Sequence, residues 1–330
     1  MTGWIVVNHY LNNKRFDELY KFFNDAADRL GIRLVKKTNS ELMGRFIVSE
    51  NYSYGHAEAE KPLRQKSICE KQLLMREASY EMQPLRQESM RETPCDIPDF
   101  VLFWDKDVKL ARMMEKAGFK VFNSADAIER CDDKARTNIA LAGEGIRMPK
   151  TFVSPLTYFE EGLDGEEFAS NIESQIPYPV VVKDCMGSFG EQVCLAHNRE
   201  ELLRIIRSKG RTPFIVQEFI RTSQGRDLRI YVAGGKARAT IMRFNNKDFR
   251  ANYVDGADMK AFSPTRKQEE MAVRVAELLG LTFGGIDILF GENDEPVFCE
   301  ANSNAHFKKL YTVTGVNMAE EIIKCIAEQI

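Results

Sequence analysis

The stretch that decides the fold lies near the C-terminus, where residues 284–302 read GGIDILFGENDEPVFCEAN. Its two arms are rich in β-branched and aromatic residues, and a polar turn containing Gly, Asn and Asp separates them, so the stretch predicts a β-hairpin. Pro296 has no N–H to donate to a strand ladder, which suits the first position of the second strand. The sequence therefore predicts one strand over 284–290 and another over 296–302.

Acidic and amide side chains are spaced along this hairpin in a way that favours a metal site. If Phe290 pairs with Val297, Asp287 lies opposite Glu300, and Asn302 follows two residues later on the same face. Opposed carboxylates repel each other unless a cation lies between them. Carboxylate and amide oxygens that leave room for phosphate and water are the ligands that Mg²⁺ prefers. The alternative is a solvated hairpin with two unrelated acids, because a one-residue change of register moves every side chain to the other face.

Length and composition limit the class of protein. A chain of 330 residues with 44% hydrophobic residues can hold two domains or one large α/β unit. The net charge of −3 gives no global basic field for nucleic acid, and no apolar run approaches the length of a membrane span. The N-terminus lacks the layout of a signal peptide. Seven scattered cysteines without a C-x-x-C pair fit a reduced protein, so we expect a cytoplasmic location.

The first third of the chain alternates strand and helix patterns. Gly31 and Gly118 stand where two helical patterns should end. Such alternation predicts a parallel sheet with helices packed on it. The expected strands are 4–7, 32–35, 100–104 and 119–122, and the expected helices are 16–30 and 107–117. The charged stretch 56–93 interrupts this order, and we interpret it as an inserted helical excursion, a lid or a solvated decoration.

The remaining chain predicts strands that pair locally and helices with clear ends. Thr265 and Gln268 form a possible capping box before a helix that Gly280 ends. The expected strands are 151–153, 180–183, 193–195 and 214–216, followed by a hairpin of 228–232 and 237–242. Helices are expected after Ser124, around 134–141 and at 200–208.

A lysine and a short glycine loop at 183–190, KDCMGSFG, suggest phosphate binding. Glycines let the backbone approach phosphate oxygens, and Lys183 adds a compact charge. The spacing is not that of a P-loop, and the strand after the loop indicates a β-loop-β flap. The residues predicted to meet phosphate here are Lys183, Gly187, Ser188 and Gly190. A surface hairpin with an exposed lysine explains the loop equally well.

Further candidates surround these two motifs. The extended segment 217–220 offers an apolar slot and backbone hydrogen bonds suited to adenine, or else it is an ordinary strand. Asp227 could hold ribose hydroxyls, and Arg229 on the same strand face could reach a phosphate or carboxylate. An arginine beside a transferring phosphoryl group stabilises charge in the transition state, which makes Arg243 and Arg250 catalytic candidates together with Lys183. A solvated polar surface is the alternative for each cation.

Taken in order, these segments resemble the ATP-grasp superfamily and, within it, the RimK-type amino-acid ligases, over about residue 126 to the C-terminus. The resemblance rests on Lys134, Lys183 with its glycine loop, and the segments 217–220, 227–229, 249–252, 285–287 and 300–302. It implies an α/β fold with α+β elements, in which an N-terminal parallel-sheet domain precedes two α+β subdomains that sandwich the nucleotide. The implied boundaries are 1–124 for the N-terminal domain and 125–330 for the ATP-grasp domain, with a lid at about 149–212 and a catalytic subdomain at about 213–330.

The resemblance also implies roles for individual residues. Contacts to ATP would come from Lys134, Lys183, Gly187, Ser188, Gly190, Gln217, Glu218, Phe219, Ile220, Asp227, Arg229, Arg250, Ala251 and Asn252. Two Mg²⁺ or Mn²⁺ ions would bind Asp287, Glu300 and Asn302, with Glu300 bridging them. Many relatives follow the metal-binding Asn with a turn containing Ser-Pro-Gly, whereas this chain has Asn304-Ala305-His306-Phe307. Because that segment lies near the acceptor site, His306 and Lys308 become candidate substrate contacts.

The implied reaction is ATP-dependent ligation of a carboxylate to an amine through an acyl phosphate, with glutamate or a related amino acid as one substrate. The amine acceptor could be a small molecule, a peptide or a protein tail, and the chain gives no sign of a direct nucleic-acid or membrane partner. The sequence is also compatible with a homo-oligomer. Other readings are an ATP-grasp ligase of different specificity, such as one that makes a dipeptide, or a silent nucleotide-binding regulator. No H-R-D or D-F-G motif supports a protein kinase, and no G-x-G-x-x-G follows the first strand to support a dehydrogenase.

Overall fold

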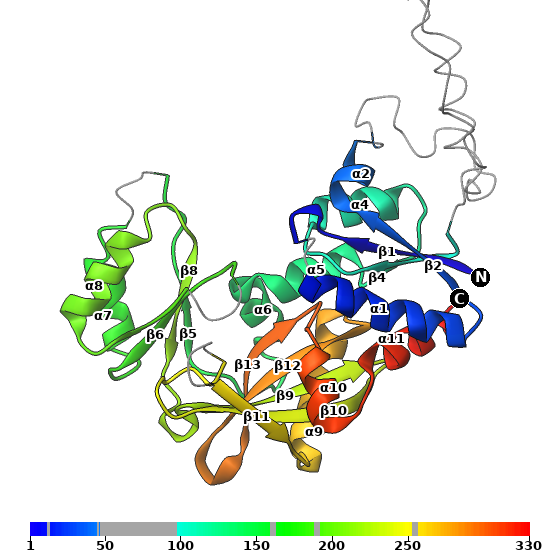
Figure 1. Cartoon of the computed structure of the whole chain (residues 1–330). Helices are drawn as coiled ribbons and strands as arrows, with labels where there is room; N and C mark the ends of the chain where they lie inside the picture. The colour runs from blue at the N-terminus through cyan, green and yellow to red at the C-terminus, as the bar shows by residue number, and fades with distance from the viewer. Residues whose placement is uncertain (12–13, 45, 47–97, 159–162, 188–191, 253–256) are drawn as a thin grey trace, which may run out of the picture. The chain divides into compact units, whose positions relative to one another are not determined.

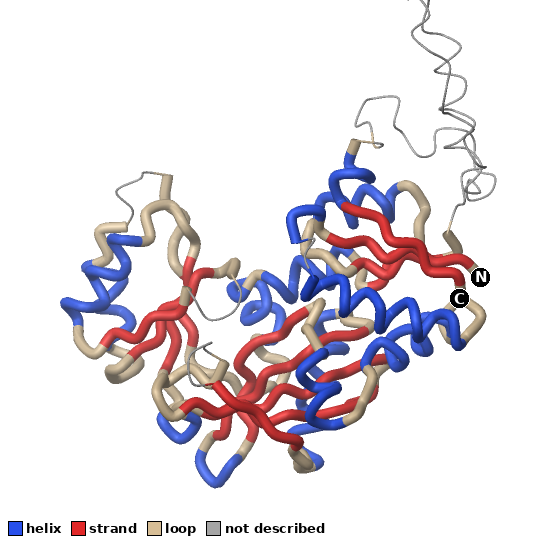
Figure 2. Tube along the Cα trace, in the orientation of Figure 1, coloured by secondary structure: helices blue, strands red, loops and turns tan. Residues whose placement is uncertain are grey.

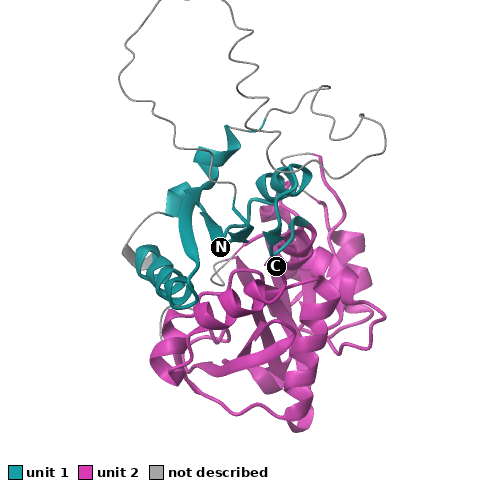
Figure 3. Ribbon diagram, turned by 90° about the vertical axis from the view of Figure 1, so that its right-hand side faces the viewer, with its two compact units in different colours: residues 1–125, 330 teal, residues 126–329 magenta. Residues whose placement is uncertain are grey.

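A computed structural model of the chain describes residues 1–11, 14–44, 46, 98–158, 163–187, 192–252 and 257–330. The described residues form two compact units, one of residues 1–125 with residue 330 and the other of residues 126–329 (Figure 3). The predicted insertion at 56–93 lies outside the described residues, and so does its expected helical structure.

The first unit contains a four-stranded parallel sheet in the order β2-β1-β3-β4 (Figure 1). The parallel sheet predicted from the strand–helix alternation is therefore confirmed, and Gly31 and Gly118 adopt positive φ values of 67° and 85° after their helices. The third and fourth predicted strands are shorter than expected, the fourth by two residues. The strands are β1 Thr2–Val7, β2 Arg33–Thr38, β3 Phe100–Phe103 and β4 Val121–Phe122, and the helices are α1 Lys14–Arg29, α2 Asn39–Met43 and α4 Val108–Lys116, with a 3₁₀ turn η1 at His9–Leu11.

The second unit begins with α5, Ala125–Asp132, and α6, Lys134–Leu141, and continues into a four-stranded antiparallel sheet that we call the lid sheet. Its strands, in the order β5-β8-β6-β7, are β5 Thr151–Val153, β8 Phe214–Glu218, β6 Val180–Asp184 and β7 Val193–Ala196. Helices α7, Glu166–Glu173, and α8, Arg199–Ser208, bury Ile172, Leu202 and Ile206 against it. Because β8 completes this sheet, the lid sheet runs to Glu218, past the boundary expected near 212.

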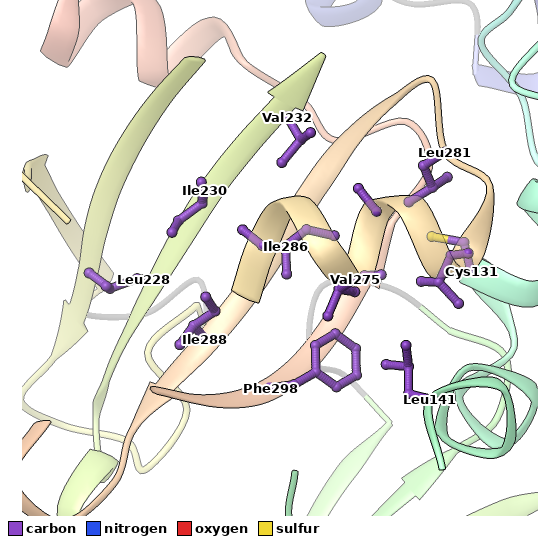
Figure 4. Close-up of a cluster of buried hydrophobic side chains, with 14 of the residues drawn as sticks. Cys131, Leu141, Leu228, Ile230, Val232, Val275, Leu281, Ile286, Ile288 and Phe298 are labelled. Carbon is purple, nitrogen blue, oxygen red and sulfur yellow. The ribbon is translucent and has the colours of Figure 1, made fainter. Parts of the chain in front are cut away.

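A five-stranded antiparallel sheet, the large sheet, forms the rest of the second unit (Figures 1 and 2). Helix α9, Arg266–Leu279, covers one face, and Figure 4 shows Val275 of α9 among Ile230, Ile286, Ile288 and Phe298 of the strands. The predicted capping box of Thr265 and Gln268 is present. The strands, in order, are β11 Ala257–Ala261, β10 Lys236–Asn245, β9 Arg226–Ala233, β12 Phe283–Phe290 and β13 Pro296–Asn302, and helices α10 Lys308–Thr314 and α11 Met318–Ala327 follow. Short 3₁₀ turns η2, Arg221–Ser223, and η3, Glu292–Asp294, complete the unit.

The pairing of β12 with β13 corrects one detail of the sequence prediction. Phe290 pairs with Pro296, not with Val297, so the hairpin starts one residue out of the expected register. A β-bulge between Asp287 and Ile288 then shifts the pairing by one residue, with Cys299 as the extra residue, and Asp287 lies opposite Glu300 as expected. Without this bulge, Glu300 would fall on the face that packs against α9. The bulge therefore places Asp287 and Glu300 on the same face.

Among the helices of the described residues, none combines the length and apolar character needed to cross a lipid bilayer.

Candidate functional site

The candidate site lies on the face of the large sheet that points away from α9. Strand side chains alternate between two faces, so when Ile286 and Ile288 pack into the core beneath the sheet, Asp287 points to the other side. The same alternation along β9 and β10 brings Asp227, Arg229 and Arg243 to that face. Four charged side chains from three strands are thereby placed side by side.

These four side chains form a continuous ion network, which we call the clasp. Arg229 donates from Nε and Nη2 to the two carboxylate oxygens of Asp287, at 2.6 and 2.7 Å. Arg243 donates in the same two-pronged way to Asp227, at 2.6 and 2.7 Å, and its Nη2 also lies 2.8 Å from Asp287 Oδ2. Paired guanidinium–carboxylate bonds of this length are strong and fix orientation. Asp287 therefore receives three donors while only 2% of it is exposed.

The clasp sets the protonation of its acids. Burial alone raises the pKa of Asp287, but the charges and hydrogen bonds of Arg229 and Arg243 outweigh it and hold this pKa below its usual value. For Asp227, burial is the stronger effect, and the pKa lies above its usual value despite Arg243. Burial also raises the pKa of Tyr231, the next residue on the same strand face. Asp287 is thus the carboxylate that the network keeps ionised most firmly.

Asp227 is bound to Arg243 in this structure, and its predicted contact with ribose stays a prediction. Both oxygens of Asp227 are bonded to Arg243, and the residue is only 7% exposed. A carboxylate in this position would have to break two charge-assisted bonds to reach a ribose hydroxyl. Asp227 instead holds Arg243 in place, a role that the spacing along one strand could not reveal because its partner lies on the neighbouring strand.

Two lysines predicted to meet phosphate approach the β13 side of the site. Lys134 Nζ lies 3.8 Å from Glu300 Oε1 and donates to the carbonyl of Gly187 at 3.3 Å. Lys183 Nζ lies 3.9 Å from the thiol of Cys299. The start of the glycine loop, both lysines and the acidic hairpin are thus within contact of one another, although they come from α6, β6 and β13.

Cys299 was missed in the sequence prediction. It is the extra residue of the bulge, and burial raises the pKa of its thiol to about 11. A thiol with this pKa stays protonated at neutral pH, so Cys299 is a poor nucleophile. Cys299 lies inside the predicted strand 296–302, but no periodic signal singled it out, because a bulge breaks the alternation on which such signals depend.

The glycine loop is described up to Gly187. Gly187 has a φ of 153°, and a Cβ atom at this position would lie 2.6 Å from the side-chain oxygen of Gln192, so no larger residue fits without a rearrangement. The predicted phosphate contacts Ser188 and Gly190 lie outside the described residues and stay predictions.

The predicted adenine segment follows the end of β8. Gln217 is buried, and its Nε2 donates to Thr151 Oγ1 at 2.9 Å, so its side chain supports the lid sheet instead of facing a nucleotide. Glu218 is held through its main-chain N–H to the carbonyl of Lys150 at 2.9 Å. Phe219 packs against Phe249, with ring centroids 6.1 Å apart. The extended chain of Glu218, Phe219 and Ile220 then leads into η2, which agrees with a hinge between the two sheets.

The segment 250–252 follows a strand of the large sheet and contacts the lid sheet through Arg250. Arg250 donates to both oxygens of Asp248 at 2.8 Å and, at 3.3 Å, to the carbonyl of Val193 in β7 of the lid sheet. Ala251 is buried and Asn252 is half-buried. The structure therefore gives Arg250 a partner on the lid, while the predicted contacts of Arg250, Ala251 and Asn252 with phosphate stay predictions.

The loop after β13 is tied down at several points. Ser303 Oγ donates to Asp132 Oδ2 at 2.6 Å, and the hydroxyl of Tyr231 donates to the carbonyl of His306 at 2.7 Å. Gly285 lets the loop approach, since a Cβ there would lie 2.6 Å from Cβ of Ala305. Lys308 is exposed at the start of α10. The predicted substrate contacts His306 and Lys308 thus border the site, on a loop that Tyr231 and Asp132, two residues missed in the sequence prediction, hold in place.

The donor atoms of Asp287, Glu300 and Asn302 fit a hard divalent cation. Asp287 and Glu300 are cross-strand neighbours, and Asn302 is two residues further along the same face. Its Nδ2 atom is buried without a hydrogen-bond partner among the described residues, and its Oδ1 atom is the one that a cation would bind. Within the described ranges, no group of three His, Cys, Asp or Glu side chains is placed to hold a metal. Two carboxylates and one amide, completed by phosphate and water, suit Mg²⁺ or Mn²⁺.

Comparison with known proteins finds a matching family and similar sequences. The family described as RimK-like ATP-grasp domain matches residues 131–326. The uncharacterized protein MG012 of Mycoplasma genitalium is 32% identical over 233 residues, which cover 70% of this chain and 81% of that protein. Human N-acetylaspartylglutamate synthase A is 32% identical over 209 residues, which cover 62% of this chain and 51% of the human protein.

A solved structure shares the fold over the whole chain. The RimK domain ATP-grasp protein of Sphaerobacter thermophilus superposes with a TM-score of 0.63 at 18% identity and covers 99% of this chain and 100% of that one. The fold class expected from the sequence is thereby confirmed, including an ATP-grasp fold with mixed parallel and antiparallel sheets. At this identity the superposition supports the shared fold alone.

Proposed function

This chain belongs to the RimK-like ATP-grasp family. From that membership we propose that it joins a carboxylate to an amine, with L-glutamate or a related amino acid supplying one of these two groups. The chain is an ATP-dependent ligase that forms carbon–nitrogen bonds, and enzymes of this class use ATP and a divalent metal ion. The choice of glutamate is supported by the human relative, whose name specifies a glutamate-containing product.

The observation that carries this proposal is the convergence of three kinds of group on one face of the large sheet. Hard oxygen donors come from Asp287, Glu300 and Asn302. Cations come from Lys134, which lies 3.8 Å from Glu300, and from Lys183, beside Cys299. Donors, cations and a glycine loop in one place suit the β- and γ-phosphates of a nucleotide.

The chain's own residues then supply positioning and charge. Lys134 and Lys183 hold phosphate oxygens and so position the nucleotide for phosphoryl transfer. Arg243, fixed by Asp227, is placed to stabilise charge on the phosphoryl group as it moves to the substrate carboxylate. When bound, the metal ions neutralise phosphate charge as phosphoryl transfer proceeds. The amine attacks the resulting acyl phosphate and releases phosphate, which completes the amide.

The acceptor is set by the loop at 303–307. Its sequence differs from the Ser-Pro-Gly turn of many relatives, and its backbone is held by Tyr231, Asp132 and the close approach at Gly285. We propose that Asn304 and His306, which are half-buried on this loop, contact one of the amino-acid substrates.

The test is a hydroxylamine assay with ATP, Mg²⁺ and a panel of amino acids. Hydroxylamine intercepts an acyl phosphate and gives a hydroxamate together with ADP, so the wild-type chain should form both with its true carboxylate donor. Glu300→Gln and Lys183→Ala should lower the rate at least a thousandfold while the melting temperature stays near that of the wild type. Glu269→Gln and Lys21→Ala, at exposed positions of α9 and α1, are matched controls that should keep full activity.

ADP release by the wild-type chain without any hydroxamate, over a full donor panel, would argue against an acyl phosphate. Near-normal turnover by Glu300→Gln would remove the metal assignment.

A further inference from the structure

The clasp raises a question that the proposed function leaves open. Asp287 is expected to bind a metal ion, yet both of its carboxylate oxygens already receive guanidinium donors. Oδ2 accepts from Arg229 and from Arg243, and Oδ1 accepts from Arg229. A metal ion on Asp287 would therefore share its oxygens with two positive groups, and like charges this close repel strongly.

The two arginines are not equally free to move. Arg243 keeps two bonds to Asp227 whether or not Asp287 is available, and its side chain is 7% exposed. Arg229 forms both of its carboxylate bonds with Asp287, and its side chain is 16% exposed. The contacts thus make Arg229 the arginine that gives way, while Asp227 keeps Arg243 in position.

The surroundings of Arg229 indicate where it would act after release. A Cβ atom at Gly285 would lie 2.6 Å from Ala305 Cβ and 3.4 Å from Arg229 Cδ, so the stem of Arg229 runs beside the 303–307 loop. Tyr231, the next residue on this face of β9, donates to the carbonyl of His306 in the same loop. This loop borders the proposed substrate site, where a guanidinium can bind a carboxylate through two parallel bonds.

We propose that Arg229 occupies the metal-binding side of Asp287 until a divalent ion displaces it. In the metal-free chain Arg229 holds Asp287 in place. Once displaced, Arg229 binds the carboxylate of the amino-acid substrate. This inference rests on the proposed function and adds an order of binding to it. The metal–nucleotide complex binds first, and the anionic substrate gains its arginine only afterwards. The acyl phosphate is thus never formed before Arg229 is released from Asp287.

The experiment measures Mn²⁺ binding in the presence of ADP by electron paramagnetic resonance, with no turnover needed. A displaced arginine competes with the metal, so Arg229→Gln should bind Mn²⁺ on the order of tenfold more tightly than the wild type. Arg229→Lys keeps the charge but loses the two-pronged bond, and it should also bind more tightly. Arg238→Gln is the matched control, because Arg238 lies on the neighbouring strand β10 and pairs with Glu321 at 2.9 Å; its Mn²⁺ affinity should equal that of the wild type.

Unchanged or weaker Mn²⁺ binding by Arg229→Lys would overturn the proposal. Tighter binding by Arg229→Gln without any change in Arg229→Lys would also overturn it, since simple repulsion would then explain the effect. A second measurement follows the Nε–H resonance of Arg229 by ¹⁵N NMR during titration with Mg²⁺ and ADP. We expect this proton to lose its protection from solvent exchange while that of Arg243 stays protected, and retained protection of Arg229 at saturation counts against displacement.

Failure of the Arg229 displacement can be distinguished from failure of the proposed function. A wild-type chain that forms hydroxamate while both Arg229 variants bind Mn²⁺ as the wild type does would reject displacement alone. A wild-type chain that binds no Mn²⁺ with ADP would reject the metal site and the proposed function together.

Discussion

The two faces of the β12–β13 hairpin have opposite chemistry, although successive residues of the same two strands supply both faces. On the face toward α9, Ile286, Ile288 and Phe298 are almost completely buried in the apolar core. On the other face, Asp287 and Glu300 lie side by side in a charged cluster. The difference depends on a single extra residue, Cys299, because the bulge changes which side chains of β13 point to which face. The comparison teaches that this site depends on register as much as on residue identity.

Insertion of one alanine between Cys299 and Glu300 should break the comparison most severely. With one more residue before Glu300, either Glu300 turns toward α9, which places an unpaired charge in the core at a cost of about 3–5 kcal/mol, or the strand loses its pairing. We expect no measurable hydroxamate formation and a clearly lower free energy of unfolding in urea. Cys299→Ala keeps the bulge and is the control, with activity within about threefold of the wild type. Normal activity in the insertion variant would show that the register of β13 does not matter for the site.

Phe298→Ala tests the apolar face alone. Phe298 is 1% exposed, and truncation of a buried Phe typically lowers stability by about 3–5 kcal/mol. The free energy of unfolding should fall by this amount, whereas the activity per folded molecule should change little, because the charged face keeps its partners. A large loss of kcat at a temperature where the variant is folded would mean that the two faces are coupled.

Asp227→Asn tests the charged face alone. The amide can no longer accept two charge-assisted bonds from Arg243, so this arginine loses its anchor and shifts toward Asp287. We expect kcat to fall about ten- to a hundredfold, the effect typical of a residue that orients a functional group, with the KM for ATP nearly unchanged. A change confined to the KM for ATP would instead support the ribose contact that the sequence predicted.

Thr265→Ala is the mildest test, at the N-terminus of the helix beneath the sheet. It removes one half of the capping box with Gln268 and should lower the free energy of unfolding by about 1 kcal/mol without an effect on kcat. Thermal or urea unfolding followed by circular dichroism measures the difference. Thr265→Ser, which keeps the capping hydroxyl, should behave as the wild type, and equal stability of the Ala variant would show that α9 is held by packing alone.

The local features of this fold could be predicted from the sequence because each depends on neighbouring residues. The parallel strands of the first unit, the capping box at Thr265 and the stop at Gly280 all follow from spacing, from side-chain capping or from the ability of glycine to adopt positive φ. The pairing of Asp287 with Glu300 was also expected, but from a register that is wrong at Phe290 and is corrected by the bulge.

By itself, the sequence predicted which chemical groups the candidate site contains: the oxygens of Asp287, Glu300 and Asn302 and the cations Lys134 and Lys183. Only the tertiary structure decided which of them are partners. That Arg243 binds Asp227 depends on the register of the β9–β10 hairpin. That Arg229 binds Asp287 and that Gln217 turns into the lid sheet depends on contacts between strands far apart in the chain. Periodicity within one strand gives the face of a side chain, but the neighbour it meets there is set by the register of the next strand, which is fixed only when the whole sheet forms.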